Sequence, residues 1–451
     1  MSRRLWTVGR GWRTPGRLVA AGAVAIVVLF APFAALAVGT GRADTALRVI
    51  GRDAGPQVLA TADLYFALSD ADAQVANLLA MGGERDQARA ATLARYEQRR
   101  VEIGAALLQA HRLAGDSSAE QRTIASILDG YLRFERLAGR ALLLAEQAGY
   151  PSGVPPPRVL AVYREATDLM SYQVLPQAYN LTLENGTTVR RTHDDARAAI
   201  LAARVAVAAG GAAAVGCLVW LQLYLARRFR RLVNPALLAA TVIVLVHAVT
   251  GVVVLTGQAD GLRVATRDGF DPVLSLARGR AVSNSLHADQ VRYLIDPQRA
   301  DTYAQIYLDK AQSLVYAEAG SLDAYYAAMA GAPQAVGLLG APAARTADGT
   351  AGDTLAAYER LQRADRDLRA LVARGATGAA VESWFGPTGT AFRSYDAALV
   401  QLTGRYRAVF EGAVADGEDT MDDLWFWPAV IIMVAVALVV AGVRPRLAEY
   451  R

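Results

Sequence analysis

The chain has 451 residues, of which 53% are hydrophobic and 20% charged, and its formal net charge is +5. A mean hydropathy of +0.21 is too high for an ordinary soluble protein and points to membrane-spanning segments. The single cysteine excludes a disulfide framework and a cysteine-based metal cluster, so any folded domain must be stabilised by packing.

Four apolar runs predict four transmembrane helices, because each approaches the roughly 20 residues that a helix needs to cross a bilayer. The runs lie at about residues 18–39, 201–226, 235–257 and 426–443. Ala35-Leu36-Ala37 resembles a signal-peptidase site, so cleavage of the first run is the alternative. Its apolar core is longer than that of most signal peptides, which favours a retained span.

The pieces on one side of the spans are rich in arginine and nearly free of acids. The tail 1–17, the loop 227–234 and the tail 444–451 hold 12 of the 47 basic residues and one of the 42 acids. By the positive-inside rule these pieces, both termini included, are cytoplasmic parts of a multi-pass cell-membrane protein. The remainder carries 35 basic against 41 acidic residues, so the high pI does not indicate nucleic-acid binding. The candidate cytoplasmic contact is the set Arg227, Arg228, Arg230 and Arg231.

Two long polar segments, 40–200 and 258–425, lie between the spans and are rich in Ala, Leu and Arg, which favours helices. Glycine and proline clusters divide each segment into four helical stretches. In the first segment the breaks fall near residues 81–83, 115–117 and 149–157, and in the second near 296–297, 331–352 and 375–389. We therefore predict an all-α membrane protein with two extracytoplasmic up-and-down four-helix bundles.

The two segments also resemble a tandem duplication. Ala71-Asp72 and Ala288-Asp289 share a local pattern and lie at nearly equal distances from the preceding span. The stretch 67–83, ALSDADAQVANLLAMGG, sets short polar side chains beside a helical packing stripe, and Asp289 falls on such a stripe. Candidate signal or ligand contacts are Asp70, Asp72, Asn77, Asn284, His287, Asp289 and Tyr293.

A buried carboxylate such as Asp289 needs a partner, for which Arg292, a tyrosine hydroxyl and a bound molecule remain open. For Asp70 and Asp72 a solvated helix face is the alternative. In up-and-down bundles the turns 81–84 and 150–157 lie together at the membrane-distal tip. Aromatic side chains near such tips, Tyr150, Trp384 and Phe385, are candidate partner-docking anchors if exposed, although Trp384 and Phe385 could instead cap the core.

No catalytic constellation is present in the sequence. The four histidines lack metal-ligand spacing, and there is no phosphate-binding loop, dinucleotide fingerprint or nucleophile elbow. His247, inside the third run, is expected to be a neutral, hydrogen-bonded packing residue. We expect no enzymatic activity, no cofactor and no metal site.

The string ALSDADAQVANLLAMGG, the later HADQVRYLIDP and the four-span plan resemble the GlnX family of membrane sensors. The resemblance implies a relay between a solute-binding lipoprotein outside and a soluble Ser/Thr protein kinase inside, with an amino acid as the signal. It implies no functional residue, and it leaves a homo-oligomer open. A structural or adhesion-type envelope protein is the alternative function, and a transporter subunit a weaker one.

Overall fold

The computed structural model describes residues 13–229, 234–331, 336–343, 349–422 and 427–448, and within these ranges every regular element is a helix. Contact clustering divides the chain into two compact units. We call them the apolar unit (Met1–Gly51, Arg190–Thr266 and Glu411–Arg451) and the polar unit (Arg52–Val189 and Arg267–Phe410). The predicted all-α fold is confirmed.

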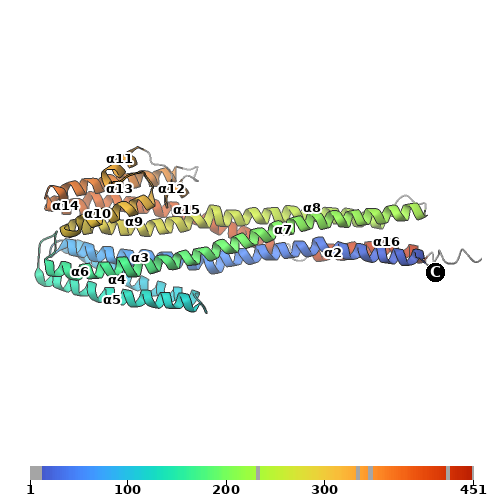
Figure 1. Ribbon diagram of the computed structural model, residues 1–451, viewed down its shortest axis with the longest axis horizontal. Helices are drawn as coiled ribbons and strands as arrows, with labels where there is room; N and C mark the ends of the chain where they lie inside the picture. The colour runs from blue at the N-terminus through green and yellow to red at the C-terminus, as the bar shows by residue number, and fades with distance from the viewer. Residues whose placement is uncertain (1–12, 230–233, 332–335, 344–348, 423–426, 449–451) are drawn as a thin grey trace, which may run out of the picture. The chain divides into compact units, whose positions relative to one another are not determined.

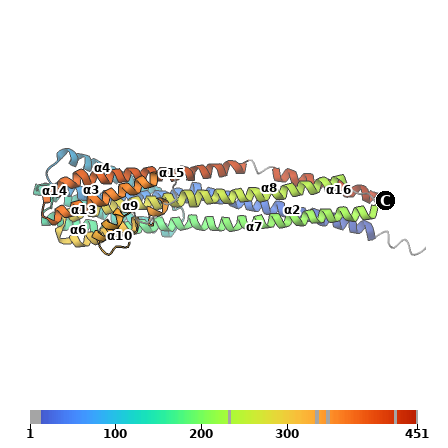
Figure 2. The same ribbon diagram turned by 90° about the horizontal axis from the view of Figure 1, so that it is seen from above.

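The apolar unit contains the four predicted spans. They belong to α2 (Arg13–Arg48), α7 (Leu175–Phe229), α8 (Pro235–Arg263) and α16 (Trp427–Ala448), which run side by side (Figure 2). Small residues let the backbones approach closely, because a Cβ on Gly211 would lie only 2.5 Å from the Cβ of Ala248. Each of the four helices has a window that is long and apolar enough to cross a membrane. The chain is therefore a multi-pass membrane protein.

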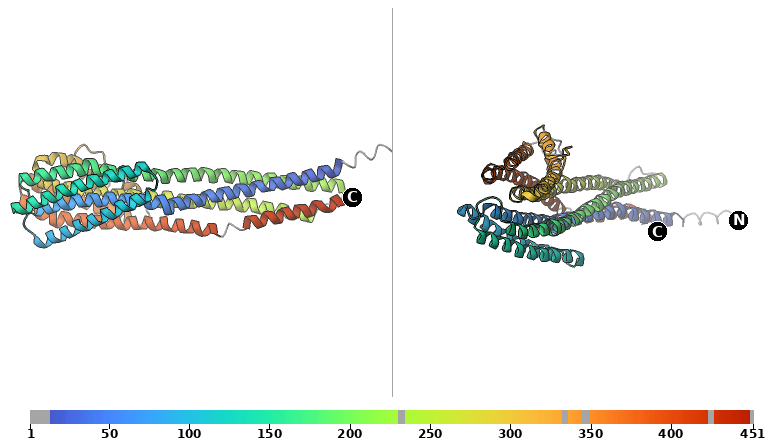
Figure 3. Two further views of the ribbon diagram at one scale, coloured as in Figure 1. Left: turned by 90° about the horizontal axis from the view of Figure 1, so that it is seen from below. Right: turned by 60° about the vertical axis from the view of Figure 1, so that its left-hand side comes forward.

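The first polar segment folds as four packed helical stretches (Figures 1 and 3). These are α3 (Gly55–Met81), α4 (Asp86–Leu113), α5 (Ser118–Ala148), and α6 (Pro157–Leu169), which runs through η2 (Met170–Val174) into α7. The breaks are the predicted ones. Gly82 turns the chain at φ +59°, where a Cβ would lie 2.8 Å from the Pro151 carbonyl oxygen, so only glycine fits.

The second polar segment repeats this plan with more irregular connections. Its elements are α9 (Asp271–Ile295), η4 (Pro297–Arg299), α10 (Ala300–Leu314), α11 (Leu322–Ala330), α12 (Gly340–Ala343), α13 (Thr350–Ala373), α14 (Thr377–Ser383), η5 (Trp384–Thr388) and α15 (Gly389–Asp422). Four of these helices, α9, α10, α13 and α15, supply most of a second apolar core. Several buried tyrosines belong to this core, among them Tyr325 and Tyr358, whose hydroxyl oxygens lie 3.0 Å apart.

The two segments do not stand apart, because α3 and α9 pack along each other and place both in the single polar unit (Figure 1). One apolar core includes residues of both segments. Of the 27 residues of α3, 20 are buried, and of the 25 of α9, 18 are buried, against 5 of 28 in α4. The short polar side chains of α3 therefore do not face solvent: Ser69 and Asp72 contact α9, and Asp70 pairs with Arg99 of α4.

The predicted meeting of turns 81–84 and 150–157 is confirmed, since the Gly83 amide donates to the Tyr150 carbonyl at 2.9 Å. The prediction of exposed aromatic anchors there is wrong. Tyr150 is buried and its hydroxyl donates to the Leu79 carbonyl at 2.7 Å. Trp384 is buried against Asn77 and His287, and Phe385 is half-buried with the Arg85 guanidinium 4.8 Å above its ring. Tyr150 and Trp384 cap the core because the polar tip of each finds a partner inside, whereas the half-buried Phe385 ring packs against the core.

Candidate functional site

Four ionised side chains meet in the interior between α3 and α9, and we call them the charge cluster: Asp72, Asp289, Arg292 and Lys310. The Arg292 guanidinium forms ion pairs with Asp72 of α3 and, at 2.5 Å, with Asp289 of its own helix. Lys310 of α10 reaches the other Asp289 oxygen, also at 2.5 Å. The cluster has two charges of each sign and links both segments.

Burial dominates the electrostatics of the charge cluster. The side chains of Asp72, Asp289 and Arg292 are 1–3% exposed. Burial raises the pKa of Asp72, and Arg292 partly offsets this. Burial acts against the charge of Arg292, but Asp72 and Tyr163 raise its pKa well above the ordinary value. Removing Arg292 would leave Asp72 buried without its counterion, which is expensive in a low-dielectric interior.

The charge cluster is not fully satisfied. Thr167 donates to one Asp72 oxygen at 3.1 Å, but the other oxygen, Oδ1, is buried and has no hydrogen-bond partner among the residues that the structure describes. The predicted need of Asp289 for a partner such as Arg292 is confirmed. The sequence did not show that Arg292 also holds Asp72, because those residues are 220 positions apart.

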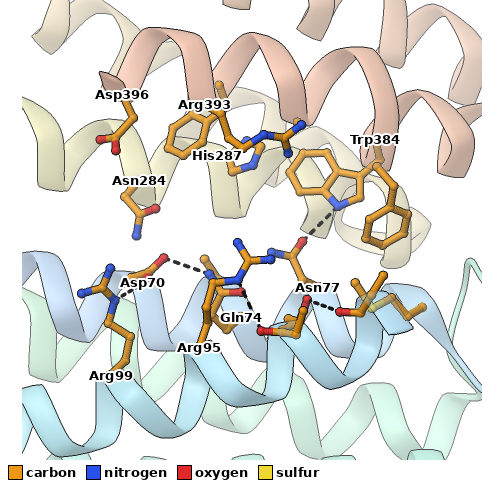
Figure 4. Close-up of a pocket in the computed structure, with 18 of the residues that line it drawn as sticks. Asp70, Gln74, Asn77, Arg95, Arg99, Asn284, His287, Trp384, Arg393 and Asp396 are labelled. Carbon is orange, nitrogen blue, oxygen red and sulfur yellow. Dashed lines mark hydrogen bonds and ion pairs between the residues drawn. The ribbon is translucent and has the colours of Figure 1, made fainter. Parts of the chain in front are cut away.

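A cavity of about 510 Å³ opens on one side of the α3–α9 pair, within the polar unit, and we call it the arginine cavity (Figure 4). Its walls come from α3, α4, α9, η5 and α15. Seven ionised side chains line it: Asp70, Arg85, Arg95, Arg99, Arg280, Arg393 and Asp396. Its lining therefore carries more cations than carboxylates, although Glu102 and Glu382 also pair with Arg99 and Arg85.

The two carboxylates of the arginine cavity are already paired. Asp70 accepts from Arg99 at 2.5 Å and from Gln74 at 3.0 Å, while Asp396 forms a bidentate pair with Arg280 at 2.7 and 2.9 Å. Arg85 is paired with Glu382 at the rim. Among the described residues, Arg95 and Arg393 form no ion pair with a carboxylate. Both lie at the cavity in Figure 4, one on each side.

Asn284 contributes an unused donor to the arginine cavity. This side chain is 3% exposed, and its Nδ2 has no hydrogen-bond partner in the described part of the chain. Such an orphan is unusual, because most buried polar atoms are paired. Asn77, in contrast, accepts from the Trp384 indole at 2.9 Å and is satisfied.

An aromatic wall closes one side of the arginine cavity. His287 stacks between Trp384 and Phe392, with ring centroids 4.3 and 3.9 Å away. Its Nδ1 lies 2.7 Å from the Gln290 side-chain oxygen. Burial lowers the pKa of His287 to about 4, so the ring is neutral at pH 7 and adds apolar surface rather than charge.

A second cavity, of about 690 Å³, lies between α3, α6–α7, α9 and α10, and we call it the tyrosine cavity. Tyr65, Tyr172, Tyr179 and Tyr303 line it together with part of the charge cluster. Its two cations, Arg292 and Lys310, belong to the cluster and are paired. Asp168 is paired with Arg299 at 2.9 Å. This cavity therefore offers no free cation among the residues that line it.

The remaining predicted residues lie away from both cavities. Tyr293 is half-buried, with the Arg369 guanidinium 4.3 Å from its ring centroid. Arg227 is exposed, whereas the side chain of Arg228 and all of Arg230 and Arg231 lie outside the described residues. His247 stacks on Phe33 at 3.8 Å, as expected of a packing residue, but its buried Nε2 has no hydrogen-bond partner among the described residues, so the expected hydrogen bond is not found there. Among the described residues, no group of three or more His, Cys, Asp or Glu could hold a metal ion.

Arg95 and Arg393 are not among the candidate contact residues that the sequence predicted. Of the predicted contacts, the structure brings Asp70, Asn77, Asn284 and His287 together at the arginine cavity, and Asp72 and Asp289 in the charge cluster. The available signal for Arg95 was its i, i+4 spacing from Arg99 on α4, which puts two cations on one helix face.

Comparison with known proteins gives one match. Residues 46–194 match the family model of an actinobacterial sensor domain. The match covers the first polar segment, with α3, α4, α5, α6 and the beginning of α7. No curated protein and no solved structure matches the chain. The match indicates a sensing role.

Proposed function

We propose that this chain is a non-enzymatic transmembrane signal relay whose input is received by the polar unit and whose output is passed to a cytoplasmic partner. The observation that carries the proposal is helix continuity. α3 and α9, which carry Asp72, Asp289 and Arg292, each continue into a span, because the chain is helical from Val19 to Met81 and from Pro235 to Ile295. A shift of α3 against α9 can therefore be passed along the same helices.

Two π-helical segments support this reading. η1 (Val49–Ala54) and η3 (Val264–Phe270) lie where the chain passes from one compact unit to the other. π-Helical turns often mark functional positions in otherwise regular helices, because they widen the helix and leave its hydrogen bonding less regular. They give each of the two helices a position at which it can bend or rotate.

The finer assignment follows from the resemblance to the GlnX family. We propose that a solute-binding lipoprotein delivers the state of an extracytoplasmic amino acid to the polar unit. A Ser/Thr kinase then reads the arginine-rich cytoplasmic pieces, with both termini inside. Reporter fusions near residues 10, 230 and 448 should all give the cytoplasmic signal. An external signal at residue 448 would contradict this topology.

A disulfide lock tests the relay. Ser69 contacts α9 at Ala281, where the Ser69 hydroxyl lies 3.4 Å from the Ala281 carbonyl oxygen. In a Cys217→Ser background, Ser69→Cys with Ala281→Cys should form a disulfide and make kinase-dependent phosphorylation insensitive to the external amino acid. Reduction should restore the response, and each single cysteine variant is the control. A structural or adhesion-type protein would show no signalling difference between locked and reduced forms.

A further inference from the structure

We propose that the arginine cavity is itself a receptor site for a small organic anion that carries carboxylate groups. This inference deepens the proposed relay and rests on it for the meaning of the signal, whereas binding can be measured independently. At about 510 Å³ the arginine cavity falls within the usual range of small-molecule sites. A ligand of amino-acid or dicarboxylic-acid size fits this volume.

Hydrogen-bond donors of the residues that line the arginine cavity indicate the charge of the ligand. Within the described part of the chain Arg95 makes one long bond, from Nε to the Ala91 carbonyl oxygen at 3.4 Å, and Arg393 donates to the Thr390 hydroxyl at 2.8 Å. Both side chains are exposed, and each guanidinium has five N–H donors, so most of these donors make no bond within the described residues and are open to solvent or to a ligand. The buried Asn284 Nδ2 adds another donor without a partner. A site with three unused donor groups, two of them cationic, favours an oxyanion.

The aromatic wall favours an organic anion over an inorganic one. Neutral His287, Trp384 and Phe392 form a stacked apolar surface beside the cations. The indole N–H of Trp384 is already bonded to Asn77, so this surface has little left to offer a fully polar ion such as phosphate. It can pack against the hydrocarbon part of a carboxylate. Planar guanidinium groups bind carboxylates in bidentate geometry.

The position of the two arginines gives binding a structural consequence. Arg95 belongs to α4 of the first polar segment, and Arg393 to α15 of the second. They lie on opposite sides of the arginine cavity in Figure 4. An anion held by both would bridge the two segments and change the balance of forces across the α3–α9 contact. The ligand would therefore bias the element that the proposed relay requires.

The test is calorimetric titration of the full chain in lipid nanodiscs with succinate, L-glutamate, L-aspartate and inorganic phosphate. At least one carboxylate should bind, and Arg95→Gln or Arg393→Gln should weaken it about ten- to a hundredfold. Asn284→Asp should abolish binding by adding a negative charge. Arg136→Gln, on the exposed face of α5 outside both cavities, is the matched control and should bind normally.

Binding of phosphate alone, binding that survives both arginine changes, or no binding of any carboxylate would overturn the inference. If the arginine variants lose capture of a partner protein while the parent chain binds no free anion, the arginine cavity receives a carboxylate of that partner, and the inference also fails. Normal carboxylate binding without any effect on kinase signalling would instead refute the proposed function and leave the site standing.

Discussion

The arginine cavity and the tyrosine cavity flank the same pair of helices and differ in what their charges do. The arginine cavity is lined by α4 of the first segment and α15 of the second, and the tyrosine cavity by α6–α7 of the first and α10 of the second. Each segment therefore contributes its second helix to one cavity and its last helix to the other. In the tyrosine cavity both cations are held by the charge cluster. In the arginine cavity Arg95 and Arg393 have no carboxylate. The charges at the tyrosine cavity therefore stabilise the fold, whereas the charges of Arg95 and Arg393 are available to a ligand.

A tandem duplication would produce this arrangement, because at each cavity the second helix of one segment meets the last helix of the other beside α3 and α9. The matched sensor domain covers only the first segment, so duplication stays a prediction. If it is correct, the charged side chains have diverged more than the helix order.

The largest expected loss of stability comes from a substitution at the tyrosine cavity. Arg292→Met leaves Asp72 and Asp289 buried without their shared counterion, and should lower the free energy of unfolding by about 3–5 kcal/mol. Lys310→Met should have a smaller effect, because Lys310 is 23% exposed and Asp289 keeps Arg292. Denaturant titration of the purified full chain measures both. Equal losses in the two variants would mean that Arg292 is not the centre of the charge cluster.

An intermediate effect is expected from pH at the aromatic wall of the arginine cavity. Because the folded pKa of His287 is lowered to about 4 from 6.5, its contribution is fully present above pH 6.5 and is lost as the pH falls toward 4. The loss should approach about 3 kcal/mol, at 1.36 kcal/mol per pKa unit. His287→Gln should flatten this part of the stability profile. The same slope in both proteins would place the titrating group elsewhere.

The smallest stability effect should come from the unpaired arginines. Arg95→Gln and Arg393→Gln remove cations that support no ion pair, so the unfolding free energy should change by no more than about 0.5 kcal/mol. Arg280→Gln is the matched comparison, because it breaks the bidentate pair with Asp396 in the same cavity. Its loss should be larger. Destabilisation by Arg95→Gln as large as that of Arg280→Gln would show that Arg95 is structural.

Local patterns in the sequence predicted the fold well. Hydropathy located the four spans, and glycine and proline located the helix ends, because both signals depend on neighbouring residues. The pairing of Asp289 with Arg292 was also accessible, since they lie three positions apart on one helix. What could not be predicted was the register of α3 against α9. Only that register brings Asp72 to Arg292 and encloses the short polar groups of α3.

The prediction of exposed aromatic anchors was wrong for a related reason. Trp384 lies within a predicted break, where an exposed anchor and a core cap have the same sequence pattern. The difference is the acceptor that Asn77 provides, 307 positions away. Arg95 and Arg393 were missed because an arginine on a helix is usually solvated. Their role depends on a cavity whose two sides come from different segments.

Hydrogen–deuterium exchange of the full chain in nanodiscs, with and without saturating L-glutamate or succinate, tests most directly whether the arginine cavity is the input site. We predict that peptides around Arg95 of α4 and Arg393 of α15 gain protection together, while peptides around Tyr172 and Asp309 at the tyrosine cavity do not change. Protection confined to the tyrosine cavity, or none at either cavity with a carboxylate that binds, would contradict the account.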